Sequence, residues 1–168
     1  MKKNIQRCAE CGKKVASEKI VIIDNRPLCP ACIYGQIKPF KIYPIGQVRN
    51  ELKRNESDFG LIGPKGISCI DIFPSQKRFM YKLEEEKFLT IVYYLHQTKS
   101  VKSVFKRGLD GKEVGVFASR TPHRLSKIGI QDVILIKVEG TTLYVEGLDA
   151  INGSPILDIK MKGDPLNT

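Results

Sequence analysis

Several features that would place this chain in a common protein class are missing from its 168 residues. It has no apolar run of about eighteen residues, the length that a membrane-spanning helix needs. Its basic N-terminus is not followed by the apolar stretch of a secretory signal. It has no strand-GxGxxG-helix unit, so a Rossmann-type nucleotide site is not expected. These absences predict a cytoplasmic protein without a membrane partner.

Acidic residues are scarce relative to basic ones. Lys and Arg number 28 and Asp and Glu 18, which gives a formal net charge of +10. A basic balance favours polyanionic partners, nucleic acid first, although it also serves solubility. Histidine is rarer still, with His96 and His123 alone, and neither is assigned as a general base. The catalytic residues therefore stay unknown at this point.

Cysteine is concentrated at one end of the chain. Cys8 and Cys11 form one C-x-x-C pair and Cys29 and Cys32 another, with seventeen residues between the pairs. Two such pairs predict one zinc ion bound by four thiolates, and a cytoplasmic location disfavours the alternative of two disulfides. So short a unit needs metal to fold. We expect a zinc-ribbon or treble-clef-like finger over residues 1–36, with a hairpin turning at Asp24 and Asn25 and with Cys69 left out.

The rest of the chain has six or seven strand candidates separated by recurring turn signals, which is typical of a small barrel or sandwich. The fold class predicted is mostly β: a small single-sheet β-barrel with one helix over residues 37–162, after the finger and before a tail at 163–168. We expect a loop at 49–64, a basic loop or short hairpin at 99–112, and the helix at 76–87. The expected strands are 37–48, 67–73, 88–95, 114–118, 133–138 and 143–146.

Residues 115–160 are the part of the chain with the most polar side chains at defined positions. An alternating pattern around Gly140 predicts two strands and a tight turn. Arg120, His123 and Arg124 lie before this hairpin, and a group from Asp149 to Pro155 lies after it. A hairpin brings its two ends together, so we expect a polar pocket over an apolar floor.

These segments carry a family resemblance. GVFASRTPHRLSKIG at 115–129 and LDAINGSPILDIK at 148–160 resemble GVFATRSPFRPNPIG and LDLVDGTPLLDIKPY, the signature of the TrmO-type, or TsaA-like, methyltransferases. An apolar strand ending in HQT, residues 91–98, also matches. The resemblance covers about residues 40–160, with three motifs in the same order.

The resemblance implies a β-barrel, often a homodimer, that binds S-adenosyl-L-methionine and methylates the exocyclic amine of threonylcarbamoyl-adenosine in tRNA. Arg120 would hold the cofactor carboxylate, and Asp149 its amine or ribose, unless Asp149 and Asn152 serve only the turn. His123, Arg124 and Lys127 are tentative substrate residues. The cofactor-binding residues expected are His96, Gln97, Arg120, Ile130, Asp149, Asn152, Gly153, Ser154 and Pro155.

This chain also departs from the signature. RPNPIG is replaced by RLSKIG, DGTP by NGSP, and the family's P-R-Q segment has no clear counterpart. Two alternatives therefore stay open. One is a methyltransferase of the same fold that acts on a protein or a small molecule. The other is a zinc protein that binds S-adenosylmethionine without chemistry.

Overall fold

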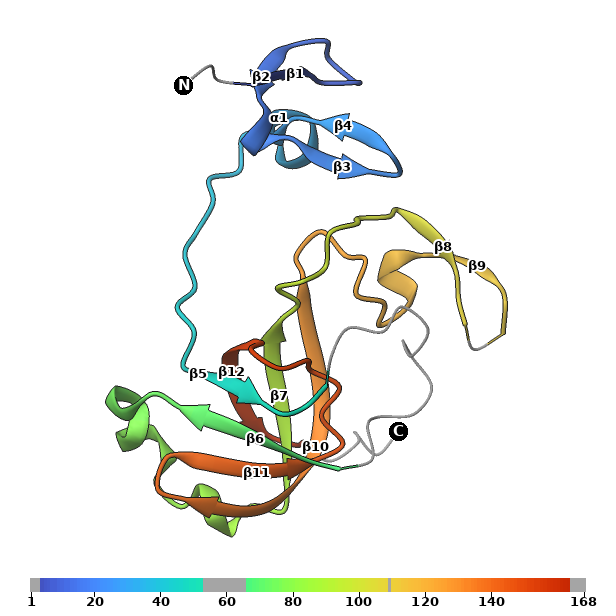
Figure 1. Ribbon diagram of the computed structural model, residues 1–168. Coiled ribbons are helices and arrows are strands. Elements are labelled where there is room, and N and C mark those ends of the chain that lie inside the picture. Colours follow the sequence, from blue (N-terminus) through green and yellow to red (C-terminus); the bar gives the residue numbers. More distant parts are fainter. Residues whose placement is uncertain (1–3, 53–65, 109, 164–168) are drawn as a thin grey trace.

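The structure is a computed structural model that describes residues 4–52, 66–108 and 110–163. Its largest part is a closed barrel of antiparallel strands in the order β10-β11-β6-β5-β12-β7. A small N-terminal unit, the finger, lies beyond one end of the barrel and is joined to it by an extended segment (Figure 1). The predicted fold class is confirmed. The barrel strands are β5 (Gly46–Arg49), β6 (Ile67–Ile72), β7 (Phe88–Tyr94), β10 (Ile128–Glu139), β11 (Thr142–Glu146) and β12 (Pro155–Met161).

Alternation along the strands builds the barrel interior, because successive side chains of a strand point to opposite faces. In β7, Leu89, Ile91 and Tyr93 point inward and are buried, while their neighbours are partly exposed. The β10–β11 hairpin turns at Gly140, whose φ of 62° is a left-handed value. The predicted hairpin is therefore confirmed. The side chains that fill the centre with no measurable exposure are Ile70, Leu89, Ile91, Leu143, Val145, Leu148 and Ile156.

The expected helix at 76–87 is wrong. The structure has two 3-10 helices there, Pro74–Met80 and Leu83–Glu85, separated by Lys82 in a left-handed conformation with φ of 60°. Met80 and Leu83 pack against the barrel core, whereas Phe79 and Tyr81 are exposed. Helices draw most of their stability from a buried face, and this segment buries too few side chains to favour a longer α-helix.

Two expected strands are shorter than predicted. The strand expected at 37–48 begins only at Gly46, since Pro39 and Pro44 have no N–H to donate to a ladder. The strand expected at 114–118 ends at Gly115 and continues as a 3-10 helix, Val116–Ala118. The basic segment forms the short hairpin of β8 (Val104–Lys106) and β9 (Glu113–Gly115). Most of the loop expected at 49–64, and all but the first residue of the tail expected at 163–168, lie outside the described residues.

The finger consists of two small hairpins and one short helix. β1 (Ile5–Arg7) pairs with β2 (Lys14–Ala16), a 3-10 helix follows (Ser17–Lys19), and β3 (Val21–Ile23) pairs with β4 (Arg26–Leu28). The predicted turn at Asp24 and Asn25 is confirmed, with φ values of 49° and 63°. The helix α1 (Pro30–Tyr34), which the sequence did not predict, is the one α-helix of the described residues.

Candidate functional site

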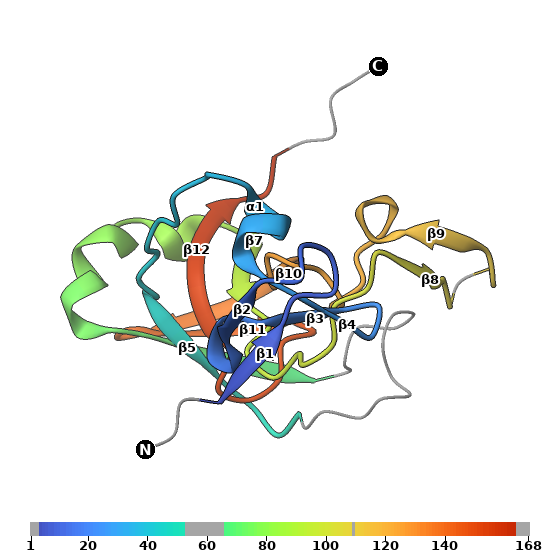
Figure 2. The same cartoon turned by 90° about the horizontal axis from the view of Figure 1, so that it is seen from above.

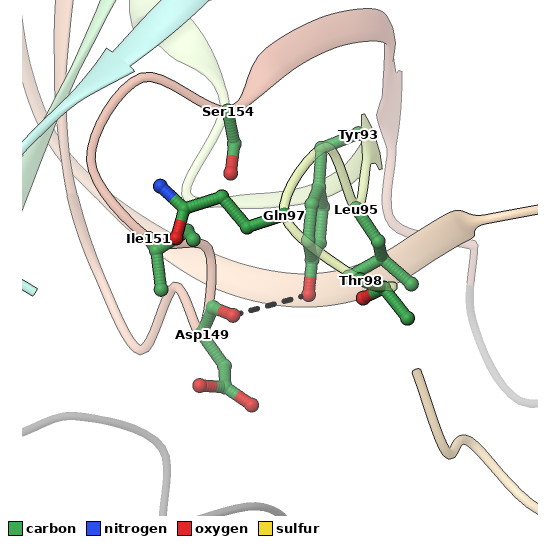
Figure 3. Close-up of a pocket in the computed structure, with 7 residues that line it drawn as sticks. All are labelled: Tyr93, Leu95, Gln97, Thr98, Asp149, Ile151 and Ser154. Carbon is green, nitrogen blue, oxygen red and sulfur yellow. Dashed lines mark hydrogen bonds between the residues drawn. The ribbon is translucent and has the colours of Figure 1, made fainter. Parts of the chain in front are cut away.

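A pocket opens where β7 ends, between the C-terminal end of that strand and the loop that leads into β12. Its lining comes from two separate stretches of sequence, as Figure 3 shows. Three of its residues, Gln97, Asp149 and Ser154, were expected from the sequence to bind a cofactor. The lining residues are Tyr93, Leu95, Gln97, Thr98, Asp149, Ile151 and Ser154.

Tyr93 connects the barrel core to this pocket. Its ring is buried in the interior, and its hydroxyl donates to the backbone carbonyl of Asp149 at 3.2 Å (Figure 3). Burial and the nearby Asp149 carboxylate both raise the pKa of Tyr93. The phenol therefore stays protonated at neutral pH and remains a donor that fixes the position of the Asp149 backbone.

The Asp149 side chain stands at the pocket rim. It keeps access to solvent, yet loss of hydration among the surrounding protein atoms raises the pKa of its carboxyl. A raised pKa makes a carboxylate a better proton acceptor near neutral pH. Among the described residues that line the pocket, Asp149 is the one with an ionisable carboxyl group.

The turn at 152–154 is held by strand β5 and the residues after it. Gly153 donates to the Val48 carbonyl at 2.8 Å and accepts from the Gln47 amide at 3.1 Å. Its φ of 80° is a left-handed value that favours glycine, and a Cβ here would be in van der Waals contact with Gln47 and His96. Ser154 is buried, and its hydroxyl lies 3.4 Å from His96 Nδ1.

Asn50 is a second brace for this turn, and the sequence did not point to it. Its side chain donates to Ser68 Oγ and to the Ala150 carbonyl, each at 2.9 Å. Its backbone N–H donates to Asn152 Oδ1 at 3.1 Å. Asn152, expected to bind cofactor, therefore uses its side-chain oxygen within the loop. Pro155 begins β12 directly after the turn.

Apart from Gln97, the predicted residues outside the 149–155 turn also lie outside the pocket lining. Arg120 is exposed, and its charge adds to the hydrogen bond from Thr90 and the charge of Lys162 in lowering the pKa of Asp132. Ile130 is 52% exposed on the outer face of β10. His123 Nδ1 lies 2.8 Å from Ser100 Oγ. The Arg124 guanidinium donates to the carbonyls of Val116, Ser119 and Thr121, so it stabilises its own loop.

Lys127 occupies a position where the resembled family has proline. Its φ is 52°, and a proline ring fixes φ near about −65°. The backbone path seen here is therefore closed to proline at this position, so the exchange changes the shape of the loop as well as its charge. The Lys127 carbonyl accepts from the Leu95 N–H at 2.8 Å, which ties the loop to the end of β7.

The enclosed part of the pocket is small, about 30 Å³. Sites for drug-sized ligands have volumes of about 300–1,000 Å³. A ligand of the size of S-adenosylmethionine would therefore extend across the pocket mouth, with only part of it enclosed.

The four finger cysteines form a compact group. Cys8 Sγ and Cys32 Sγ are 3.8 Å apart, and so are Cys11 Sγ and Cys29 Sγ; all four sulfurs lie within 4.8 Å of one another. A tetrahedral zinc ion with Zn–S bonds of about 2.3 Å sets its sulfurs about 3.8 Å apart. The donor set and its spacing therefore fit such an ion, and Cys69 lies outside the group.

Backbone N–H groups already support negative charge at one of these sulfurs. The Cys29 N–H donates to Cys8 Sγ at 3.3 Å. Hydrogen bonds from the backbone, that of Cys11 foremost, lower the pKa of the Cys8 thiol to about 6. The thiolate is the form that binds metal, so the backbone of the first knuckle favours a ligand state.

Comparison with known proteins assigns the barrel. Residues 60–162 match the family model described as the tRNA-methyltransferase O N-terminal domain. The chain belongs to this family. A probable S-adenosyl-L-methionine-binding protein of Methanothermobacter thermautotrophicus is 37% identical over 123 residues, which are 71% of this chain and 88% of that protein. An S-adenosyl-L-methionine-binding protein of Archaeoglobus fulgidus is 31% identical over 70% of this chain and 85% of its own length.

Other relatives are longer than this chain. A tRNA (adenine(37)-N6)-methyltransferase of Mus musculus is 37% identical over 54% of this chain, but the match spans only 22% of that protein. The crystal structure of TrmO from Pseudomonas aeruginosa superposes with a TM-score of 0.59 at 25% identity, over 75% of this chain and 57% of that one. In the described residues no helix is long and apolar enough to cross a membrane.

Proposed function

We propose that this protein is an S-adenosylmethionine-dependent methyltransferase that methylates the exocyclic amine of threonylcarbamoyl-adenosine in tRNA. The observation that carries the proposal is the pocket itself. Two of the three family motifs, the one ending in HQT and the one containing NGSP, meet at the end of β7 and supply all seven of its lining residues. The family match, the relatives named as tRNA methyltransferases and the net charge of +10 support it.

Bound S-adenosylmethionine would supply a methyl group activated by the sulfonium, so the protein mainly has to position the reacting atoms. Ser154 and Gln97 offer hydrogen-bonding groups inside the pocket. Asp149 has two proposed uses at the rim. It accepts a hydrogen bond from the ligand, and it takes the proton that an amine loses on methylation.

We propose that predicted cofactor residues outside the lining contact the part of the ligand that extends across the pocket mouth. Arg120 is free to turn toward a carboxylate, since no ion pair within 4.0 Å is formed by it in the described residues. For Ile130 the proposed contact is through its backbone. One structural zinc ion on the four finger cysteines is part of the same proposal, and the homodimer stays a prediction.

The direct test is transfer of a labelled methyl group from S-adenosylmethionine to tRNA in vitro. We expect label on tRNA that carries threonylcarbamoyl-adenosine and none on the same tRNA lacking that modification. The Asp149→Asn variant should bind the cofactor and transfer far more slowly. Equal labelling of both tRNAs would contradict the proposed acceptor.

A second function is favoured by the names of the relatives that this chain matches over most of their length. Both are called S-adenosyl-L-methionine-binding proteins, with no acceptor named. On this view the chain binds the cofactor and transfers nothing, or transfers to a protein or small molecule. Calorimetric binding of S-adenosylmethionine without label on any tRNA would favour it.

A further inference from the structure

The positive charge of the chain is not spread evenly. Residues 1–45, the finger and its linker, hold nine Lys and Arg against three Asp and Glu, a net charge of +6. Residues 98–127, called here the basic arm, hold eight against two, again +6. All remaining residues together hold eleven against thirteen, a net charge of −2. The barrel strands and their other loops therefore contribute nothing to the basic character of the protein.

These two basic segments are joined by hydrogen bonds at one point. The finger hairpin turns at Asp24, whose Oδ1 accepts from the Ser103 N–H at 3.0 Å and whose Oδ2 accepts from the Ser103 hydroxyl at 2.5 Å. The Asp24 N–H donates to the Val101 carbonyl at 3.2 Å, and Ile23 forms a parallel bridge with Val101. Figures 1 and 2 both show the β3–β4 hairpin reaching the arm beside β8.

Within the arm, residues 100–103 are also bonded to the segment that follows β9. The Lys102 N–H donates to the His123 carbonyl at 3.1 Å, and the Val116 N–H donates to the Ser103 carbonyl at 2.9 Å. Residues 100–103 therefore lie between the finger hairpin and the loop that carries His123 and Arg124. This arrangement makes the finger and the arm one docked unit.

The docked unit lies beside the pocket. Gln97 and Thr98 line the pocket, and the first lysine of the arm, Lys99, is the next residue. The finger stands beyond the end of the barrel from which the arm emerges (Figure 1). A polyanion bound along the docked unit would therefore pass the pocket mouth at the Lys99 end of the arm.

The linker adds side chains of a second kind. Phe40 is 83% and Tyr43 77% exposed, and Lys38 and Lys41 alternate with them along the extended chain. Cations that follow a phosphate backbone and aromatic rings on which bases stack are the combination used by proteins that bind unpaired RNA. Because both rings are largely exposed, packing within the described residues does not explain why aromatic residues occupy these positions.

We propose that the finger, its linker and the basic arm form one surface that binds RNA next to the pocket, and that Asp24 joins its two halves. The proposal rests on the proposed function for the identity of the RNA. It assigns the finger a role in holding the substrate, and it makes the barrel the part that holds the cofactor. Charge alone fits either RNA or an acidic protein, and the exposed aromatic rings among the cations favour RNA, because bases stack on such rings.

The test is binding of an unmodified tRNA transcript to the full chain without cofactor, measured by fluorescence anisotropy at rising salt. Each lost phosphate contact lowers the slope of log affinity against log salt by about 0.9. Lys106→Glu with Lys112→Glu should therefore reduce affinity and flatten the slope by about 2. The charge-matched control is Lys77→Glu with Arg78→Glu, both exposed on a 3-10 helix of the barrel, which should bind like the wild type.

Replacing Asp24 tests its joining role, because charge and docking predict opposite changes in RNA affinity. Asp24→Gly keeps the positive φ of the turn and removes one negative charge, so electrostatics alone predicts tighter binding. Undocking predicts weaker binding, by about tenfold, because the two halves no longer bind as one unit. Glu18→Gln removes an exposed finger charge without undocking and should bind equally well or tighter. Zinc content and thermal unfolding of Asp24→Gly check that the finger stays folded.

The outcomes separate this inference from the proposed function. Tighter or unchanged binding by Asp24→Gly, or equal losses in the arm pair and the barrel pair, would overturn the composite surface even if methyl transfer is found. Absence of methyl transfer with the expected binding pattern would leave the surface intact and remove only the proposed reaction.

Discussion

Gly129 is the position where one added methyl group tests the packing of the pocket most severely. Gly129 on β10 pairs with Tyr93 on β7, and a built Cβ would lie 2.5 Å from Cζ and 2.7 Å from Cε2 of the Tyr93 ring. Contacts this short require a shift, and the ring is buried in the barrel. Overpacking of this kind costs about 1–3 kcal/mol of unfolding free energy.

The predicted change is large enough to measure by thermal unfolding. For a chain of this length each kcal/mol lowers Tm by about 2–4 °C. Displacement of the Tyr93 ring would also lengthen the 3.2 Å bond to the Asp149 carbonyl, so Gly129→Ala should weaken S-adenosylmethionine binding in calorimetry. The matched control is Gly115→Ala in β9, where the nearest atom is 3.9 Å away and no change beyond about 0.5 kcal/mol is expected.

A double-mutant cycle identifies the ring as the cause. Tyr93→Leu removes the atoms that Gly129→Ala would meet, so the alanine should cost less in that background, with a coupling of about 0.5–3 kcal/mol. An unchanged Tm for Gly129→Ala beside an unchanged Gly115→Ala would refute this account of the packing.

Three further predictions follow from the site and the finger. Purified protein should hold one zinc per chain, Cys29→Ser should lose it and Cys69→Ser should keep it, as metal analysis can show. Burial raises the pKa of Asp149 in the folded state, so its ionisation lowers the free energy of unfolding as pH rises above the unfolded pKa of about 3.9. Asp149→Asn should therefore be more stable than wild type at neutral pH. Denaturant titrations should show this difference vanish as the pH is lowered toward about 3.9. Asn50→Ala should weaken cofactor binding with little change in tRNA affinity, since Asn50 holds the 150–152 backbone and lies outside the basic surface.

Local patterns in the sequence were sufficient for much of the barrel. The short apolar runs at 67–73 and 88–95 predicted β6 and β7 to within one residue, because such a run between turn signals is typical of a buried strand. The C-x-x-C spacing and the Asp24–Asn25 turn were equally readable, since each depends on neighbours along the chain. The prediction failed at 76–87, where Phe79 and Leu83 share one face of a helix drawn on the sequence, but only Leu83 packs against the core and Phe79 is exposed.

The candidate site could be predicted only in part. Gln97, Asp149 and Ser154 came from the family motifs, while Tyr93 was treated as an ordinary strand residue. The signal was present, because Tyr93 is the one inward position of β7 with a polar tip. The pairing of Tyr93 with Gly129 depends on strand register, which a single sequence does not define.

Long-range hydrogen bonds account for most of what the sequence could not show. Asn50 reaches the Ala150 carbonyl across 100 residues, and Asp24 reaches Ser103 across 79. Asn and Asp are common in turns, so the residue type at positions 50 and 24 does not indicate a partner far along the chain. The docking of the finger on the basic arm is therefore a result of the structure alone.

The central claim is that the chain methylates threonylcarbamoyl-adenosine in tRNA, and one measurement tests it most directly. Bulk tRNA from a strain lacking this protein is digested to nucleosides and compared with the parent strain by mass spectrometry. We predict that the methylated form of threonylcarbamoyl-adenosine disappears, that its unmethylated form increases in proportion, and that wild-type protein restores it whereas Asp149→Asn does not. Identical nucleoside profiles in the two strains would contradict the account.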